Sequence, residues 1–164
     1  MQVAGRVVVV TGGAKGIGQA LCERFHREGA KKVVVADIDV AGAQAVAKAI
    51  GGAAMRCDVT NEADIVRVID ETESKFGPID LFCSNAGLGV AFNVHTPNAA
   101  GDSNELWTLG WNVHVMAHVY AARTLTPRMK QRGGGYFLNT VSAAGLLSQI
   151  GSAIYSTTKH AAVG

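Results

Sequence analysis

The stretch VVVVTGGAKGIG, residues 7 to 18, decides how the rest of the chain is interpreted. Val7 to Val10 form a short run of β-branched, wholly apolar residues, which is typical of a parallel strand buried on both faces. Glycines follow at positions 12, 16 and 18, and a helical pattern then runs from about Ile17 to Glu28. The stretch therefore predicts a buried strand, a tight glycine turn and a helix in direct succession.

The glycine turn is also a candidate phosphate-binding site. Its spacing, G-x-x-x-G-x-G, differs from the dinucleotide fingerprint G-x-G-x-x-G, but the physical reasons for glycine are the same. Glycine lets the backbone turn sharply and lets a pyrophosphate approach the N-terminus of the following helix. A tight strand–helix turn that binds nothing would carry the same glycines, so the turn alone leaves both interpretations open.

The rest of the chain repeats the alternation of strand and helix. Further strands are expected over residues 33–36, 54–57, 79–83 and 136–141. Helices are expected over residues 41–50, 60–76, 105–132 and from about 153, with Thr60 as the N-cap of the second and Glu62 and Asp64 in its first turn. Residues 89–103 show no period and are expected to form a loop. This alternation predicts an α/β fold with a doubly wound parallel sheet, which binds ligands at the carboxyl ends of its strands.

Composition excludes several classes of partner. The 164 residues suffice for one domain, and a net charge of +2 is spread along the chain without a basic run, so we expect no nucleic-acid partner. The longest aliphatic run is too short for a membrane span or a signal peptide, so a soluble cytoplasmic protein without a membrane partner is expected.

Cysteines and histidines give no sign of a metal site. Cys22, Cys57 and Cys83 are isolated and are expected to be buried, reduced thiols. His114 and His118 lie four residues apart, but they lack the H-E-x-x-H arrangement and an evident third ligand. We therefore interpret both histidines as packing or subunit-contact residues.

An acid follows the second predicted strand and bears on the choice of cofactor. Asp37 lies 19 residues after Gly18, where a carboxylate accepts hydrogen bonds from an adenosine ribose and repels a 2′-phosphate. Lys15, in the glycine turn, favours the opposite choice because a cation there attracts a 2′-phosphate. A like-charge contact at Asp37 outweighs an exposed attraction at Lys15, so NAD is favoured and NADP stays possible. An Asp that only caps the next helix is the alternative.

The stretch YSTTK, residues 155 to 159, contains a candidate proton donor. Tyr155 and Lys159 are four residues apart, so on a helix they share one face. A phenol beside an ammonium is a proton donor and acceptor suited to neutral pH. A surface Tyr and Lys on a solvated helix face would show the same spacing.

In combination, these motifs resemble those of the short-chain dehydrogenase/reductase family. The resemblance covers essentially the whole chain and rests, in order, on TGGAKGIG (11–18), Asp37, CDVT (57–60) with Asp58, SNAG (84–87), Asn112, Ser142 and YSTTK. A lone Y-x-x-x-K occurs by chance in many helices, but the order of glycine turn, acid, NAG and Tyr–Lys is specific. The resemblance implies a Rossmann-like sheet of five strands in the order 3-2-1-4-5 within a single dinucleotide-binding domain over residues 1–164.

The resemblance also implies catalytic roles. Tyr155 would be the general acid and base, and Lys159 would bind the nicotinamide ribose and favour the phenolate form of Tyr155. Ser142 would hydrogen-bond the substrate oxygen, and Asn112 would support a water relay from Lys159 to solvent. The implied reaction transfers a hydride between NAD, or NADP, and a small-molecule secondary alcohol or ketone, with no metal.

Further positions would bind the cofactor. Asp58 would contact the adenine, and Asn85 with the backbone of Ala86 and Gly87 would line the site. The remaining positions implied for the cofactor are Gly12, Lys15, Gly16, Ile17, Gly18, Asp37, Ile38 and Val59.

Family members also suggest what surrounds this region. They commonly form homodimers or homotetramers through the helices that carry Asn112 and Tyr155. Residues Ala144, Leu146, Leu147, Gln149 and Ile150 would form a mostly apolar start of the substrate pocket. Because family members continue with two strands, a helix and a substrate loop, we expect the chain to be a fragment, since the fifth strand would otherwise be an unprotected edge. The alternative is a truncated nucleotide-binding module or subunit without catalysis.

Overall fold

The computed structural model of the protein describes residues 1–89, 102–148 and 150–164, so most of the predicted loop 89–103 and Gln149 lie outside the described residues. The strands are β1 (Val7–Thr11), β2 (Lys32–Asp37), β3 (Ala53–Arg56), β4 (Leu81–Ser84) and β5 (Tyr136–Asn139). The helices are α1 (Gly16–Arg27), α2 (Val40–Ala49), α3 (Glu62–Phe76), α4 (Asn104–Trp111), the π-helical turn η2 (Asn112–Met116), α5 (Ala117–Gln131), the 3-10 turn η3 (Ala143–Gly145) and α6 (Ala153–Val163).

All five strands join one parallel sheet in the order β3-β2-β1-β4-β5, which confirms the predicted topology. The central strand β1 pairs with β2 on one side, where Val8 lies opposite Val33, and with β4 on the other, where Val8 lies opposite Leu81. The chain therefore leaves β1 in one direction toward β2 and later returns to its other side, which creates a switch point at the carboxyl ends of β1 and β4.

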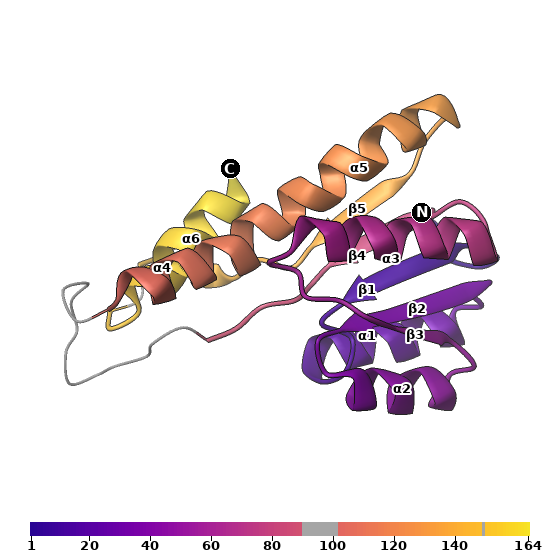
Figure 1. Ribbon diagram of the computed structural model, residues 1–164, viewed down its shortest axis with the longest axis horizontal. Helices are drawn as coiled ribbons and strands as arrows, with labels where there is room; N and C mark the ends of the chain where they lie inside the picture. Colours follow the sequence, from indigo (N-terminus) through magenta and orange to yellow (C-terminus); the bar gives the residue numbers. More distant parts are fainter. Residues whose placement is uncertain (90–101, 149) are drawn as a thin grey trace.

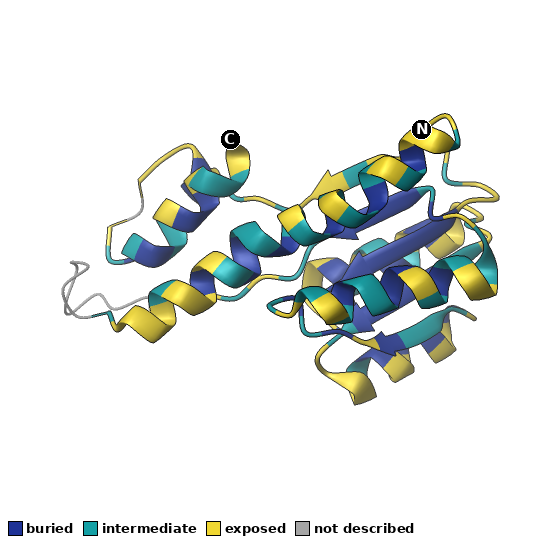
Figure 2. Ribbon diagram, turned by 45° about the horizontal axis from the view of Figure 1, so that its top comes forward, coloured by how far each residue is buried: buried dark blue, intermediate teal, exposed yellow. Residues whose placement is uncertain are grey.

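Alternation along β1 builds the two halves of the core. Val7 and Val9 pack into a cluster with residues of α3 and α5, whereas Val8 and Val10 pack into a second cluster with residues of α1 and α2. Figure 1 shows these two helical layers on opposite faces of the sheet. Strands β1 and β4 are buried throughout, while β5, at the sheet edge, is largely exposed (Figure 2). A strand covered on both faces needs only apolar side chains, which explains the unbroken valine run.

The long helix predicted over residues 105–132 is interrupted by a π-helical turn. Helix α4 continues through η2 into α5, which runs past Pro127 to Gln131. A π-turn adds residues to one turn and shifts the side chains that follow it around the helix axis. Leu106 and Leu109, before the turn, are exposed, whereas Val113 within it is buried. The first part of this helix and α6 extend beyond the end of the sheet (Figure 1).

Several predicted boundaries differ from the structure. The N-cap of α3 is Asn61, whose side chain accepts a hydrogen bond from the amide of Ala63, so the prediction of Thr60 was wrong. The hydroxyl of Thr60 instead donates to Asp58, which takes it away from the helix terminus. Strands β4 and β5 also end or begin one or two residues from the predicted positions, as is usual at element ends.

The expectation that the cysteines are buried, reduced thiols agrees with the structure. The three cysteines are buried and unpaired. Within the described ranges, no helix is both long and apolar enough to cross a bilayer. The same ranges contain no cluster of three or more His, Cys, Asp or Glu residues that could hold a metal ion.

Candidate active site

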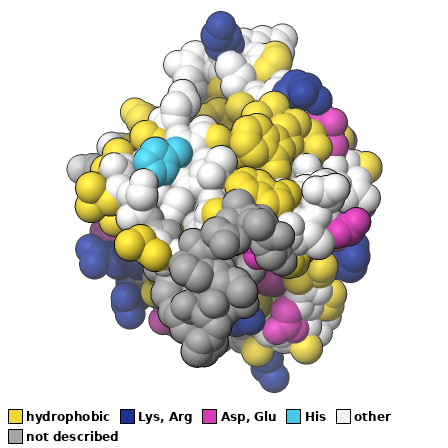
Figure 3. All heavy atoms as spheres, turned by 90° about the vertical axis from the view of Figure 1, so that its left-hand side faces the viewer, with side chains coloured by type: hydrophobic (Ala, Val, Ile, Leu, Met, Phe, Trp, Pro, Cys, Tyr) yellow, Lys and Arg dark blue, Asp and Glu magenta, His cyan; other side chains and the backbone are white. Residues whose placement is uncertain are grey.

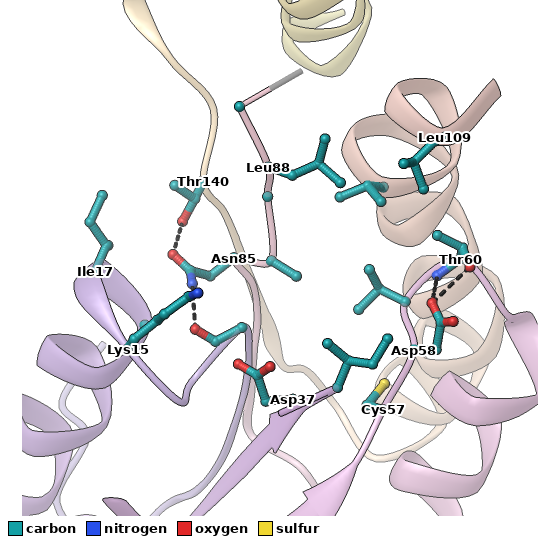
Figure 4. Close-up of a pocket in the computed structure, with 18 of the residues that line it drawn as sticks. Lys15, Ile17, Asp37, Cys57, Asp58, Thr60, Asn85, Leu88, Leu109 and Thr140 are labelled. Atoms are coloured by element: carbon teal, nitrogen blue, oxygen red, sulfur yellow. Dashed lines mark hydrogen bonds between the residues drawn. The ribbon is translucent and has the colours of Figure 1, made fainter. Parts of the chain in front are cut away.

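A cavity of about 740 Å³ lies at the switch point of the sheet, beyond the carboxyl ends of β1, β2 and β4. Figure 4 shows Lys15 and Ile17 on one side of it, Asp37 at the end of β2, and Asp58 with Thr60 on the opposite side. Of the predicted site residues, those that line the cavity are Gly12, Lys15, Ile17, Gly18, Asp37, Ile38, Asp58, Val59, Asn85, Ala86, Gly87, Tyr155 and Lys159. Segments more than 100 residues apart in sequence therefore share one cavity.

The glycine turn is shaped by close backbone contacts. Gly12 has a φ of +66°, and a Cβ on it would lie 2.7 Å from the α-carbon of Ala86. A Cβ on Gly18 would lie 2.0 Å from the carbonyl oxygen of Gly12. Only glycine fits at either position, because real Cβ contacts stay above about 3 Å. The turn therefore brings the start of α1 against the segment that follows β4.

Helix α1 begins at this turn without an acidic side chain. Its N-cap residue, Lys15, makes no side-chain cap, and its first turn contains no Asp or Glu. The amide groups of a helix N-terminus carry partial positive charge and favour an anion. With the exposed Lys15 ammonium beside them, this side of the cavity is positive and suits a phosphate.

Asn85 holds the switch point together. Its Nδ2 donates to the carbonyl oxygen of Thr11 at 3.0 Å, its backbone amide donates to the hydroxyl of Thr11 at 3.0 Å, and its Oδ1 accepts from the hydroxyl of Thr140 at 2.9 Å. One side chain thus ties together the segments that follow β1, β4 and β5 (Figure 4). The sequence predicted that Asn85 lines the cavity, but the tie to Thr140 was not predicted.

The carboxylate of Asp37 is held in a defined position at the end of β2. One oxygen accepts a hydrogen bond from the amide of Ala14 at 2.9 Å, and the other accepts from the amide of Asp39 at 2.9 Å. The side chain is half-buried and points along the cavity wall. A negative group is therefore presented to whatever occupies this side of the cavity.

Asp58 and Val59 form the wall opposite the glycine turn. The carboxylate of Asp58 accepts hydrogen bonds from the amide and the hydroxyl of Thr60, at 3.0 and 2.7 Å. Its backbone amide donates to Asp64, whose carboxylate also pairs with Arg56 and Arg67. Hydrogen bonding to the amide of Asp58, together with Arg67 and Arg56, lowers the pKa of Asp64. Asp58 therefore sits on a rigid, ion-paired support.

Tyr155 and Lys159 reach the cavity from α6. Lys159 is 3% exposed, its Nζ donates to the carbonyl oxygen of Thr140 at 3.2 Å, and it lies 5.6 Å from the centre of the Tyr155 ring. Burial lowers the pKa of the Lys159 ammonium. A cation and a phenol thus lie together at the end of the cavity nearest α6.

His114, which the sequence suggested was a packing or subunit-contact residue, lies directly beside this pair. Its ring is fully buried and stands perpendicular to the Tyr155 ring, with centres 5.4 Å apart. Its Nδ1 is 2.9 Å from the hydroxyl of Thr158, and its Nε2 is 3.0 Å from the carbonyl oxygen of Leu88. Burial, and then the charge of Lys159, lowers the pKa of His114 to about 4, so the imidazole is neutral at pH 7.

His118 occupies the next turn of the same helix. Its Nδ1 is 2.7 Å from the hydroxyl of Ser84, at the end of β4. Its Nε2 is the one buried side-chain polar atom of the described residues that lacks a hydrogen-bond partner. Burial, and then Lys159, lowers the pKa of His118 to about 4.

Three predicted site residues do not line the cavity within the described part of the chain: Gly16, Asn112 and Ser142. Asn112 is half-buried at the start of η2. The hydroxyl of Ser142 accepts a hydrogen bond from the amide of Ala144 at 3.2 Å and caps η3. The roles assigned to these residues stay predictions.

The segment between η3 and α6 is apolar and exposed. Leu146, Leu147 and Ile150 are 71%, 71% and 84% exposed, whereas Ala144 is buried. Hydrophobic side chains also appear in the space-filling view of the end of the molecule that carries α4 and α6 (Figure 3). Leu146, Leu147 and Ile150 do not line the cavity, so their role as the apolar start of the substrate pocket stays a prediction.

Comparison with known proteins shows which family the chain is similar to. The sequence pattern described as "short chain dehydrogenase" matches residues 6–164. The chain is 37% identical to the sex determination protein tasselseed-2 of Zea mays, over 98% of this chain and 48% of that protein. It is 30% identical to (+)-borneol dehydrogenase 2 of Salvia officinalis, over 100% of this chain and 58% of that protein.

Solved structures show the same architecture. A short chain dehydrogenase/reductase from Burkholderia phymatum, in complex with NAD, superposes with a TM-score of 0.90 at 31% identity, over 99% of this chain and 58% of that one. Levodione reductase superposes with a TM-score of 0.91 at 26% identity, over 98% and 63%. The chain thus spans about half to three fifths of the length of these proteins. With its glycine turn, its Asn85 tie and its Tyr155–Lys159 pair at one switch point, this chain belongs to the short-chain dehydrogenase family.

Proposed function

We propose that the protein is an NAD-dependent oxidoreductase that transfers a hydride between the nicotinamide and a secondary alcohol or ketone. The observation that carries this proposal is the placement of Tyr155 and Lys159 at one end of a cavity whose other end is the glycine turn. One end suits a phosphate and the other suits proton transfer, so a dinucleotide that spans the cavity would bring its reactive ring to the proton donor.

The cofactor would be held by residues that the structure already orients. The glycine turn and the N-terminus of α1 would bind the pyrophosphate, and Asp37 would accept hydrogen bonds from the adenosine ribose. Asp58 and Val59 would contact the adenine. Asp37 favours NAD, because its carboxylate would repel the 2′-phosphate of NADP, and the NAD complex of the similar Burkholderia phymatum protein supports the same choice.

Tyr155 would carry the proton. When bound, the nicotinamide supplies the hydride acceptor for alcohol oxidation, or the hydride donor for carbonyl reduction. In oxidation the phenolate of Tyr155 would take the hydroxyl proton while the C–H bond breaks, and in reduction the phenol would return a proton to the carbonyl oxygen. The Lys159 ammonium, buried beside the ring, would attract the negative charge that develops on the Tyr155 oxygen while the proton moves.

Ser142 is proposed to position the substrate oxygen. Its hydroxyl oxygen accepts from the amide of Ala144, which leaves its hydrogen to be donated to a carbonyl. Leu88, Leu109 and Val113 add apolar surface to the cavity. The names of the similar borneol dehydrogenase and levodione reductase suggest borneol and levodione as the first substrates to test.

The first test is binding. Titration of the protein with NADH and then NADPH, followed by cofactor fluorescence, is expected to show saturable binding with a preference for NADH. Asp37→Ser should narrow or reverse that preference. Absence of binding by either nucleotide would overturn the proposal.

The second test is turnover of borneol with NAD and of levodione with NADH. Tyr155→Phe is expected to abolish turnover while NADH binding persists, because only the hydroxyl is removed. Tyr136→Phe is the matched control, since Tyr136 is 55% exposed on β5 and does not line the cavity. Equal activity of the Tyr155→Phe variant and the unchanged protein would refute the role of Tyr155.

A further inference from the structure

His114 joins three parts of the active site that are separate in sequence. Its Nδ1 contacts Thr158 of α6, its Nε2 contacts the backbone of Leu88 after β4, and its ring packs against Tyr155. Leu88 and Tyr155 both line the cavity. One imidazole therefore connects the helix that carries the proton donor to the opposite wall of the cavity.

Both nitrogens of His114 have suitable partners. The hydroxyl of Thr158 lies 2.8 Å from the carbonyl oxygen of Ile154, so it can donate there and accept from Nδ1 of His114. The amide nitrogen of Leu88 is 3.2 Å from Nε2, and its carbonyl oxygen is 3.0 Å away. With Nδ1 protonated, the ring donates to the hydroxyl of Thr158 and Nε2 accepts from the amide of Leu88. With Nε2 protonated, the ring donates to the carbonyl oxygen of Leu88 and Nδ1 accepts from the hydroxyl of Thr158. Either neutral tautomer therefore has one hydrogen-bond partner at each nitrogen.

The π-helical turn η2 gives His114 this position. His114 is the third residue of the turn, and it and Val113 are buried, while Trp111 just before the turn is 43% exposed. π-turns are rare and concentrate at functional sites. A regular helix through this segment would rotate the residues after Asn112 by a different amount and would carry the imidazole away from Tyr155.

Gly87 brings the same wall close to Lys159. A Cβ on Gly87 would lie 3.8 Å from Nε2 of His114 and 3.8 Å from Nζ of Lys159. The two nitrogens thus face one small space beside the Gly87 α-carbon. The contact between His114 and Leu88 holds this segment next to the Tyr155–Lys159 pair.

We propose that His114 is a positioning residue of the active site, which fixes the Tyr155 ring and the Leu88 wall relative to Lys159. This inference rests on the proposed function of Tyr155. The ring acts through Tyr155 and Lys159 and exchanges no proton with the substrate.

The surroundings of the His114 ring keep the imidazole neutral at pH 7. The titratable groups that face the His114 ring are Tyr155 and Lys159 from α6 and His118 from its own helix. Residues 85–89, the segment on its other side, contain no ionisable side chain. Among the residues that the structure describes, Lys159 is therefore the single cation at the pair, and the lowered pKa of His114 means that the imidazole adds no charge at pH 7.

The test compares two substitutions of His114. His114→Leu keeps the approximate volume and removes both hydrogen bonds. His114→Gln places an amide near the position of Nε2, where its oxygen and nitrogen can pair with the amide and carbonyl of Leu88. His160→Gln is the matched control, because His160 is an exposed histidine on α6. The measurements are NADH affinity, thermal stability, and kcat and KM for borneol oxidation as a function of pH.

For a positioning residue, His114→Leu lowers kcat about 100-fold, the scale of a misplacement by about 1 Å, while NADH affinity stays unchanged. The pH of half-maximal kcat also rises, because the phenolate is held less closely to Lys159. His114→Gln recovers most of the loss, and His160→Gln behaves like the unchanged protein. An equal loss of kcat at every pH, in parallel with NADH affinity and stability, would show a purely structural role and overturn the inference.

If His114→Leu does not fold, Thr158→Val decides the question, because it removes only the contact to Nδ1. A lower kcat with a raised half-maximal pH supports the inference, and an unchanged profile overturns it. An unchanged protein that binds NADH but oxidises no borneol and reduces no levodione would refute the proposed function, and the inference with it. Normal turnover by the His114→Leu variant would refute the inference alone.

Discussion

Gly18→Ala should damage the glycine turn more than any other single methyl group added there. The new Cβ would lie 2.0 Å from the carbonyl oxygen of Gly12 and 2.7 Å from Nδ2 of Asn85. The first of these atoms belongs to the backbone and cannot rotate away. Gly12 itself is confined, since a Cβ on it would lie 2.7 Å from Ala86. The turn or the start of α1 must therefore move by about 1 Å to restore normal contacts of about 3 Å.

Two opposing effects set the size of the change in the free energy of unfolding caused by Gly18→Ala. Overpacking of this kind costs about 1–3 kcal/mol, and the upper value applies because the clash is with backbone. Alanine is better than glycine inside a helix by about 1 kcal/mol, and Gly18 is the third residue of α1. The expected net loss in the free energy of unfolding is therefore about 2 kcal/mol.

Urea unfolding measures this loss directly. With a denaturant dependence of about 2 kcal/mol per molar, the midpoint should fall by about 1 M. NADH affinity should fall as well, because the turn that would cradle the pyrophosphate is displaced. Gly164→Ala is the matched control, since a Cβ there would come no closer than 4.0 Å to the carbonyl oxygen of Ala161 and Gly164 does not line the cavity. A Gly18→Ala variant with the stability and NADH affinity of the unchanged protein would show that the close contact between Gly12 and Gly18 does not exist.

Three further predictions concern the protonation of His114, the burial of the cysteines and the hydrogen bonds of Asn85. The pKa of His114 falls from 6.5 to about 4 on folding, so the unfolded chain binds more protons between these two pH values and the protein loses stability as the pH falls through this range. Between about pH 6.5 and about pH 5, the loss due to His114 is about 2 kcal/mol of the free energy of unfolding. The urea midpoint of His114→Gln should therefore drop less on acidification than that of the unchanged protein, and equal drops would contradict the prediction. Burial raises the pKa of the thiols of Cys22, Cys57 and Cys83 to about 12. A thiol reagent should therefore label no cysteine in the native protein and all 3 cysteines after unfolding, and rapid labelling of the native protein would refute their burial. Asn85→Ala removes the hydrogen bonds that connect Thr11 and Thr140, and it should lower the free energy of unfolding in urea by about 2–3 kcal/mol because it leaves buried polar groups unpaired. Asn61→Ala, which removes an exposed helix cap, should cost only about 1 kcal/mol, and equal losses for the two variants would contradict the role of Asn85.

Features that depend on local chemistry were predictable from the amino-acid sequence alone. The valine run of β1 reports burial on both faces, because a strand covered by helices needs no polar alternation. The glycines at 12 and 18 report close backbone approaches that no other residue permits. Asp37 at a strand end and Tyr155 four residues before Lys159 were recognisable for the same reason, since strand ends and helix spacing are short-range properties. These positions established the fold and most of the cavity.

Features that depend on contacts across the chain were decided only by the tertiary structure. No local pattern indicates a π-turn at residues 112–116, and the sequence suggested only packing or a subunit contact for His114. The folded chain places the His114 ring against Tyr155, 41 residues further along. The tie from Asn85 to Thr140 spans 55 residues, and Thr60 left the helix cap to Asn61 because Asp58 accepts its hydroxyl hydrogen. Each of these outcomes depends on which partner is nearest in space, and that distance is set by packing of the sheet and helices, which short-range patterns do not encode.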